Sequence, residues 1–161
     1  MIALSDTILR LGAATLIGSL IGLNRDLHGK PTGVRTLGLV GLGSALIVLG
    51  AMELTPQDAP DPNVVSRVVQ GVLTGIGFLG AGVILHSAST SKVHGLTTAA
   101  CAWLTACVGM MCGTGNWKVL SVAIPLTFLL LIAGGPVERW FHRRWAKSKT
   151  SHSKIDRDRS R

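Results

Sequence analysis

Hydrophobic residues along the chain fall into five long, nearly uncharged segments that are separated by short polar ones. A transmembrane helix needs about 17–25 predominantly apolar residues, and each segment is near the lower end of that range. The pattern therefore predicts an all-α, polytopic membrane protein, a bundle of five transmembrane helices. The predicted spans are residues 7–23, 36–52, 64–85, 96–112 and 117–134.

Composition supports this interpretation. The 161 residues are 47% hydrophobic and 15% charged, whereas ordinary soluble domains carry about 25% charged residues. An outer-membrane barrel would show alternating strands and aromatic girdles, and neither pattern is present. The three cysteines match no zinc or CxxC pattern, so we expect free, buried thiols. No basic stretch precedes the first apolar segment, so we expect it to remain as a helix and not to be cleaved as a signal peptide.

Basic residues in the connecting segments predict the orientation, because Lys- and Arg-rich loops stay in the cytoplasm. Segment 24–35 has three basic residues and one acid, segment 53–63 has three acids and no base, and segment 86–95 carries Lys92. Five spans with the N-terminus outside and the C-terminus in the cytoplasm place every basic loop inside. We expect residues 1–136 to form the transmembrane domain.

The net charge of +8 comes mostly from residues 138–161, which hold nine Lys or Arg and three acids. Next to a membrane helix, such a tail more often meets anionic lipid than nucleic acid, so we expect lipid and not nucleic acid as its partner. We expect residues 137–161 to be interfacial at first and then disordered. The alternative is the frayed end of the last helix. The expected lipid contacts are Arg139, Trp140, Arg143, Arg144, Trp145 and Lys147.

Small residues are concentrated in the third segment, where Gly71 and Gly75 form a GxxxG pair. In membranes such spacing allows close helix contacts. A GxGxxG pattern also begins at Gly75, but a dinucleotide site needs a preceding strand and a later acid, and neither fits here. The sequence does not decide between contacts within one chain and contacts in a homo-oligomer. The expected packing residues are Gly71, Gly75, Gly77, Gly80 and Gly82.

Polar residues near the ends of the spans form a candidate functional cluster. Topology explains the basic residues but not the amide of Asn24 or the carboxylate of Asp26. Ionisable groups within a span are often functional, although Arg67 lies near the outer end and could reach Asp61. Arg10 is expected to pair with an acid four residues earlier. The cluster comprises Asn24, Arg25, Asp26, Arg35, Thr36, Arg67, Gln70, Thr97 and Thr98.

The sequence offers no nucleophile–base pair, no carboxylate dyad and no metal-ligand spacing, so we expect neither enzymatic activity nor a resident metal or cofactor. His28, His86 and His94 show no recognisable ligand spacing. A dehydrated Mg²⁺ site would use several oxygen ligands, commonly carboxylates. None of the eight acids lies in the middle of a span, so no cation path is evident.

Together, these motifs resemble the MgtC/SapB family of bacterial inner-membrane proteins. The resemblance implies a role in adaptation to low magnesium and, in pathogens, virulence through survival inside host cells. It also implies an inner-membrane location and ATP synthase as a partner complex. Our leading hypothesis is a non-enzymatic regulator. The motifs occur in order at residues 17–25, 33–36, 67–71, 75–82 and 95–100.

The alternative is a magnesium transporter or cation channel, in which Asn24, Asp26, Thr97 or Thr98 line a hydrated path. Mg²⁺ would then be a ligand, and in the leading hypothesis it is at most a signal. The sequence departs from the family at position 24, where Asn replaces the usual Glu. Many relatives also carry a cytoplasmic ACT-like domain after the bundle, and here we expect only the short basic tail.

Overall fold

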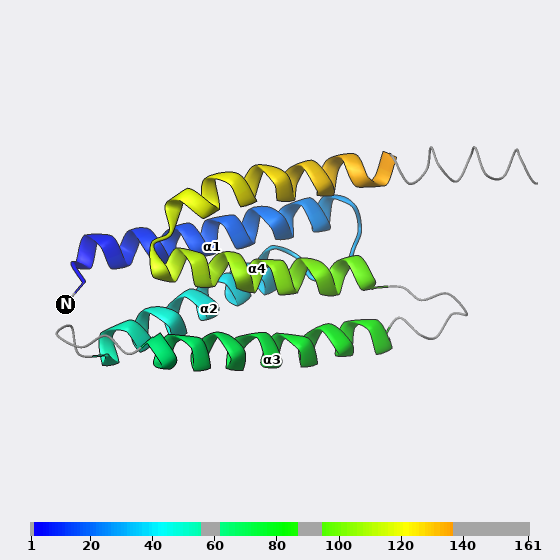
Figure 1. Cartoon of the computed structure of the whole chain (residues 1–161). Coiled ribbons are helices and arrows are strands. Elements are labelled where there is room, and N and C mark those ends of the chain that lie inside the picture. The colour runs from blue at the N-terminus through cyan, green and yellow to red at the C-terminus, as the bar shows by residue number, and fades with distance from the viewer. Residues whose placement is uncertain (1, 56–61, 87–94, 137–161) are drawn as a thin grey trace, which may run out of the picture. The chain divides into compact units, whose positions relative to one another are not determined.

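Five helices make up the described part of this computed structural model, which covers residues 2–55, 62–86 and 95–136 (Figure 1). All five are long and apolar enough to cross a membrane, and the described residues include no strand. The all-helical class and the five predicted spans are therefore confirmed. The helices are α1 (Leu4–Leu27), α2 (Val34–Leu54), α3 (Pro62–His86), α4 (Leu96–Thr114) and a last helix over Trp117–Pro136.

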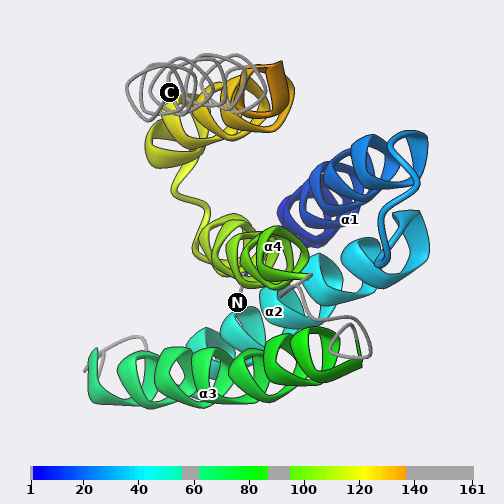
Figure 2. The same ribbon diagram turned by 90° about the vertical axis from the view of Figure 1, so that its right-hand side faces the viewer.

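The chain divides into two compact units, Met1–Ala123 and Ile124–Arg161. Within the first unit, α1, α2 and α4 each pack against the other two, and α3 packs against α2 and α4. Figure 2 shows α3 on the opposite side of α2 and α4 from α1.

Successive helices from α1 to α4 run in opposite directions (Figure 1). The C-termini of α1 and α3 therefore lie at the same end of the unit as the N-termini of α2 and α4. We call this end the Arg25 end. The opposite end, where α1 begins and α4 finishes, is the Arg10 end. Polar residues gather at these two ends because the spans between them are apolar.

Glycines allow the backbones of α1, α2 and α4 to approach closely. A Cβ atom added at Gly18 would lie 2.5 Å from the carbonyl oxygen of Leu37, and one at Gly41 would lie 2.6 Å from that of Ala14. Both distances are too short for a real side chain. Lipid supplies no hydrophobic drive for helix association, so such contacts between small residues hold membrane bundles together. Gly22, Gly109 and Gly113 make comparable approaches to backbone atoms, whereas Gly38 lies against the side-chain hydroxyl of Ser19.

The glycines of α3 behave differently from the expectation of close packing. A Cβ atom added at four of them would have no heavy atom within 4 Å, and at Gly80 it would make only an ordinary contact, 3.5 Å from Ala99. Within this chain, the close backbone contacts are therefore made by the glycines of other helices and not by those of α3. Packing between chains stays a prediction. The four open positions are Gly71, Gly75, Gly77 and Gly82.

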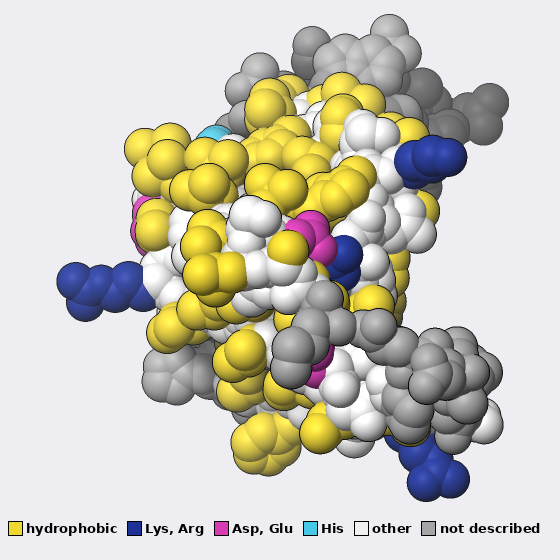
Figure 3. All heavy atoms as spheres, turned by 90° about the vertical axis from the view of Figure 1, so that its left-hand side faces the viewer, with side chains coloured by type: hydrophobic (Ala, Val, Ile, Leu, Met, Phe, Trp, Pro, Cys, Tyr) yellow, Lys and Arg dark blue, Asp and Glu magenta, His cyan; other side chains and the backbone are white. Residues whose placement is uncertain are grey.

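Large hydrophobic side chains cover much of the described surface, as one face shows in Figure 3. Leu16, Leu39 and Phe78 are each more than half exposed, at 66%, 68% and 81%. Such a surface is expected of a protein whose solvent is lipid. All three cysteines are free, with Cys101 and Cys112 buried and Cys107 half-buried. The predicted lipid-contacting tail, Arg139 to Lys147, lies outside the described residues.

Candidate functional site at the Arg25 end

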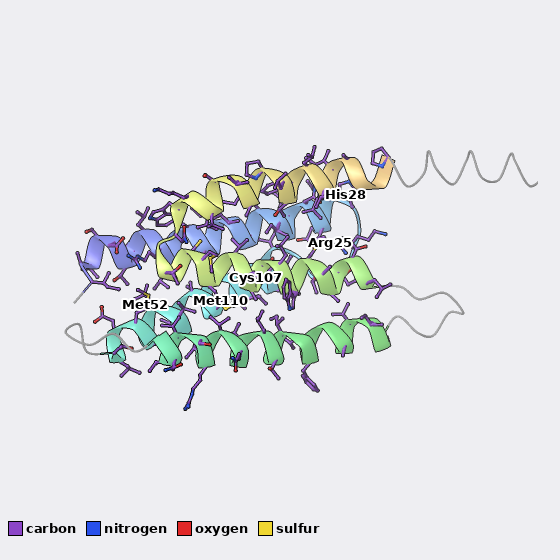
Figure 4. The ribbon with its side chains drawn as sticks, in the orientation of Figure 1. Arg25, His28, Met52, Cys107 and Met110 are labelled. Atoms are coloured by element: carbon purple, nitrogen blue, oxygen red, sulfur yellow. The ribbon has the colours of Figure 1, made fainter. Side chains whose placement is uncertain are left out.

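Arg25 is a buried cation near the C-terminus of α1, where Figure 4 labels it together with His28. Its side chain is 6% exposed, and its terminal guanidinium nitrogen donates a hydrogen bond to the hydroxyl of Thr98 on α4. Thr98 is 2% exposed. The guanidinium Nε is also buried and has no hydrogen-bond partner among the described atoms. The structure thus joins two predicted site residues that are 73 positions apart.

Asp26, the next residue, points to a different helix. Its carboxylate accepts a hydrogen bond of 3.0 Å from the backbone N–H of Val34, the first residue of α2. An acid at a helix N-terminus satisfies an otherwise unpaired donor and complements the helix dipole. A Cβ atom at Gly33 would collide with the same carboxylate. Asp26 is therefore held over the start of α2, and a side chain at position 33 would displace it.

The turn after α1 is closed by local hydrogen bonds. The His28 ring nitrogen Nδ1 lies 2.7 Å from the carbonyl oxygen of Asn24, and the Lys30 N–H donates to the carbonyl of Arg25 over 3.0 Å. Asn24 is half-buried. The backbone carbonyls of Asn24 and Arg25 thus have partners within the turn. These contacts hold the backbone of the turn that follows Arg25 in place.

Arg35 and Thr36, both exposed in the first turn of α2, lie at one end of a groove between α2 and α3. The groove has a volume of about 760 Å³ and is otherwise mostly apolar. Its walls include three small positions, Gly43 on α2 and Gly71 and Gly75 on α3. Ligand or partner sites are typically apolar clefts with a few polar groups at defined places. This groove has that character.

Two predicted members of the polar cluster lie elsewhere. Arg67 and Gln70 are exposed on α3, nineteen and sixteen residues before its last residue. At 1.5 Å per residue these positions are roughly 28 and 24 Å from the Arg25 end. They therefore do not belong to one cluster with Arg25, because the spacing along the helix separates them. Thr97 is exposed in the first turn of α4, beside Thr98.

Arg10 forms a second polar contact, at the opposite end of the bundle. Its guanidinium makes the predicted ion pair with Asp6, at 2.8 Å, and donates to the carbonyl of Gly113 in the last turn of α4, also at 2.8 Å. A cation at a helix C-terminus complements the dipole and satisfies an unpaired carbonyl. The contact with α4 was not expected. The spacing Gly109-Met-Met-Cys-Gly113 is a sequence signal for the close approach of α4 to α2 but not for this contact with α1.

The described residues contain no group of three or more His, Cys, Asp or Glu that could hold a metal ion. Their three carboxylates all lie at helix ends and have partners. Asp6 pairs with Arg10, Asp26 accepts from the start of α2, and Glu53 accepts a hydrogen bond of 2.8 Å from the Ile2 N–H. Each of the three described carboxylates is therefore already engaged by another group of the chain.

Comparison with known proteins decides the family. The sequence model of the MgtC family matches residues 11–140. The chain belongs to the MgtC family. It is 41% identical to protein SrpB of Synechococcus elongatus over 86% of this chain and 81% of SrpB. It is 40% identical to protein MgtC of Salmonella typhimurium over 78% of this chain. The resemblance identified from the sequence motifs is thus confirmed.

YhiD of Escherichia coli, provisionally described as a magnesium transporter, is 38% identical over 79% of this chain. The chain spans about half the length of Salmonella MgtC, 50%, and 60% of YhiD. No solved structure matches the chain. Family membership and the five apolar helices together identify a multi-pass membrane protein.

Proposed function

We propose that this MgtC-family protein supports adaptation to low magnesium from the bacterial inner membrane, as a non-enzymatic regulator of another membrane complex. ATP synthase is the candidate target, by the family resemblance. The proposed orientation has the N-terminus outside and the Arg25 end in the cytoplasm, following the distribution of basic residues. The description of the relative YhiD supports the link to magnesium.

The observation that carries the proposal is the open groove between α2 and α3. Its walls are mostly apolar, and Gly71 and Gly75 leave two positions of the α3 wall without a side chain. Membrane helices associate where small residues let backbones approach. A helix of a partner complex could therefore pack into this groove at short distance, as the glycines of α1, α2 and α4 already do within the chain.

The described charges favour a regulator over a cation path. Asp6, Asp26 and Glu53 lie at helix ends and already have partners. A cation entering at the Arg25 end would also meet the buried guanidinium of Arg25, and like charges repel most strongly where water is excluded.

The second candidate function is a magnesium transporter, which the description of YhiD favours. In that case Asn24, Asp26, Thr97 and Thr98 would line the inner mouth of the path. This candidate predicts Mg²⁺ flux by the purified protein alone, whereas the regulator needs its partner. The two functions can therefore be separated by experiment.

The first experiment measures ATP-driven proton pumping in inverted membrane vesicles that contain or lack the protein. Gly75→Leu fills the groove and should abolish the effect of the protein on pumping. Gly77→Leu is the matched control, because this glycine is also open but does not line the groove. If both variants act like the wild type, or if the wild type itself has no effect on pumping, the proposed action on ATP synthase is wrong.

The second experiment measures Mg²⁺ uptake into proteoliposomes with a Mg²⁺-sensitive dye. The regulator predicts no flux above that of empty liposomes. Saturable flux that is lost in Asp26→Ala would instead establish the transporter. Folded protein is verified in both preparations by its elution as a single species.

A further inference from the structure

We propose that the Arg25 end binds a phosphate-type oxyanion, held between the guanidinium of Arg25 and the first turn of α4. The ligand is either the phosphate of a lipid headgroup or free phosphate. This site does not depend on whether the protein regulates a partner or transports an ion.

Arg25 has no counter-charge among the residues that the structure describes. Arg25 is only 6% exposed. The one described hydrogen bond of its guanidinium goes to the neutral hydroxyl of Thr98. Its Nε has no partner. A buried charge without a partner is strongly unfavourable, and buried charges in proteins are normally paired. An anion bound next to the guanidinium would therefore stabilise it.

The N-terminus of α4 would also be stabilised by an anion. The first N–H groups of a helix have no acceptor within the helix, and the helix dipole places positive charge there. Gly95 precedes α4 in a left-handed conformation and offers no side-chain cap. The guanidinium of Arg25 reaches this positive end through Thr98. Two positive features therefore face each other, an arrangement that an anion between them would stabilise.

Among the described residues, no carboxylate at this end is free to pair with Arg25. Asp26 is the acid next to Arg25, but its carboxylate is held by the start of α2. The two connecting segments at this end, 28–33 and 87–94, contain no Asp or Glu in their sequences and each contains a lysine. The counter-charge must therefore come from outside the described bundle, and a ligand is its simplest source.

The donors at this end specify the chemistry of the ligand. A guanidinium, a hydroxyl and free backbone N–H groups together offer several hydrogen bonds to one acceptor group, as phosphate and sulfate require. A divalent cation would be repelled by the guanidinium of Arg25 and by the positive end of α4. The end of a membrane-spanning bundle lies at the level of the lipid headgroups, so both a lipid phosphate and a soluble phosphate can reach it.

The test measures the thermal midpoint Tm of the purified full chain in maltoside micelles, followed by tryptophan fluorescence. One arm adds sodium phosphate against sodium chloride at equal ionic strength. The other adds phosphatidylglycerol against uncharged glycolipid. Binding to the folded form should raise Tm saturably, because ligands that bind only folded protein stabilise it by mass action. A rise in Tm with sodium phosphate identifies free phosphate as the ligand. A rise in Tm with phosphatidylglycerol alone identifies the phosphate of the lipid headgroup.

Variants at Thr97 make the test specific. This residue is exposed in the first turn of α4, so Thr97→Asp supplies an internal anion and should raise the basal Tm and abolish the response. Thr97→Asn is the matched neutral control and should keep it. Arg35→Gln removes an exposed cation at the same end and should also keep the response. Arg25→Lys should weaken it, provided that this variant folds.

Three results would overturn the proposal. The first is no rise in Tm in either arm. The second is an equal response of Thr97→Asp and Thr97→Asn. The third is loss of the response in Arg35→Gln while Thr97→Asp retains it, because general attraction to surface cations would then explain the effect.

Discussion

Replacing Gly109 with alanine should destabilise the bundle, whereas the same replacement at Gly75 should not. A Cβ atom at Gly109 would meet three backbone atoms of Gly41, the carbonyl oxygen and, at 3.0 Å each, the carbonyl carbon and Cα. At Gly75 it would meet nothing within 4 Å. Both glycines lie within helices that are predicted to span the membrane. The pair therefore separates the effect of close packing from the effect of helix propensity.

The magnitude follows from two opposing contributions. Inserting a methyl group into a tightly packed site costs about 1–3 kcal/mol, and here the cost should be in the upper half because backbone atoms cannot rotate away. Alanine is a better helix former than glycine by roughly 0.5–1 kcal/mol. We therefore expect Gly109→Ala to lose about 1–2 kcal/mol of unfolding free energy and Gly75→Ala to gain up to about 1 kcal/mol.

Thermal unfolding in maltoside micelles, followed by tryptophan fluorescence, measures the difference. For a chain of this size, 1 kcal/mol corresponds to about 2–4 °C in Tm. Gly109→Ala should lower Tm by roughly 2–8 °C, and Gly75→Ala should leave it unchanged or raise it slightly. The close approach of α2 and α4 at this position would be refuted if Gly109→Ala were as stable as the wild type. A destabilised Gly75→Ala would mean that α3 packs more tightly than the structure has it.

Three further predictions concern helix ends and thiols. Asp26→Ala removes the carboxylate that caps α2 and should lower the free energy of unfolding by about 0.5–2 kcal/mol. Asp26→Asn keeps an acceptor oxygen and should lower it less, so equal losses in the two variants would argue against capping. Arg10→Met removes a charged hydrogen bond to α4 and should lower the free energy of unfolding by roughly 1.5–3 kcal/mol. Asp6→Asn breaks only a partly exposed ion pair and should lower it by under about 1 kcal/mol. A larger loss for Asp6→Asn than for Arg10→Met would contradict the role of the contact with the Gly113 carbonyl. A membrane-permeant maleimide should modify the half-buried Cys107 before Cys112, which is 0% exposed, as mass spectrometry of briefly treated protein would check.

The helical class and the spans could be predicted from the sequence because a bilayer imposes one length requirement on every span. The ends of the helices were less predictable. The first helix begins at Leu4, three residues before the predicted start, and continues to Leu27. At the N-terminal end, the ion pair with Arg10 allows Asp6 to join the helix. Hydropathy alone counts such residues against a span.

The sequence predicts that glycines permit close helix contacts, but not which glycines make them. Spacing identifies small residues that could permit a close approach, but it does not identify the neighbouring helix. Gly18-Ser-Leu-Ile-Gly22 carries the same GxxxG signal as Gly71 and Gly75. Within the chain, Gly18 meets the backbone of α2, whereas no glycine of α3 makes so close an approach. Likewise, no local pattern connects Arg25 with Thr98, because their contact depends on how α1 packs against α4.

The two arginines of α1 have opposite electrostatic roles. Arg10 lies at the C-terminal end of α4, where the helix dipole favours a cation, and Asp6 completes the pairing. Arg25 lies at the N-terminal end of the same helix, where the dipole opposes a cation, and no described acid pairs with it. The charge of Arg10 is therefore paired within the chain, although its Nε, like that of Arg25, is buried without a hydrogen-bond partner. The charge of Arg25 depends on an anion from outside the described residues. Because α1 carries both residues and packs along α4, an anion that binds at Arg25 would strengthen the contact between these helices at the end where it is electrostatically weakest.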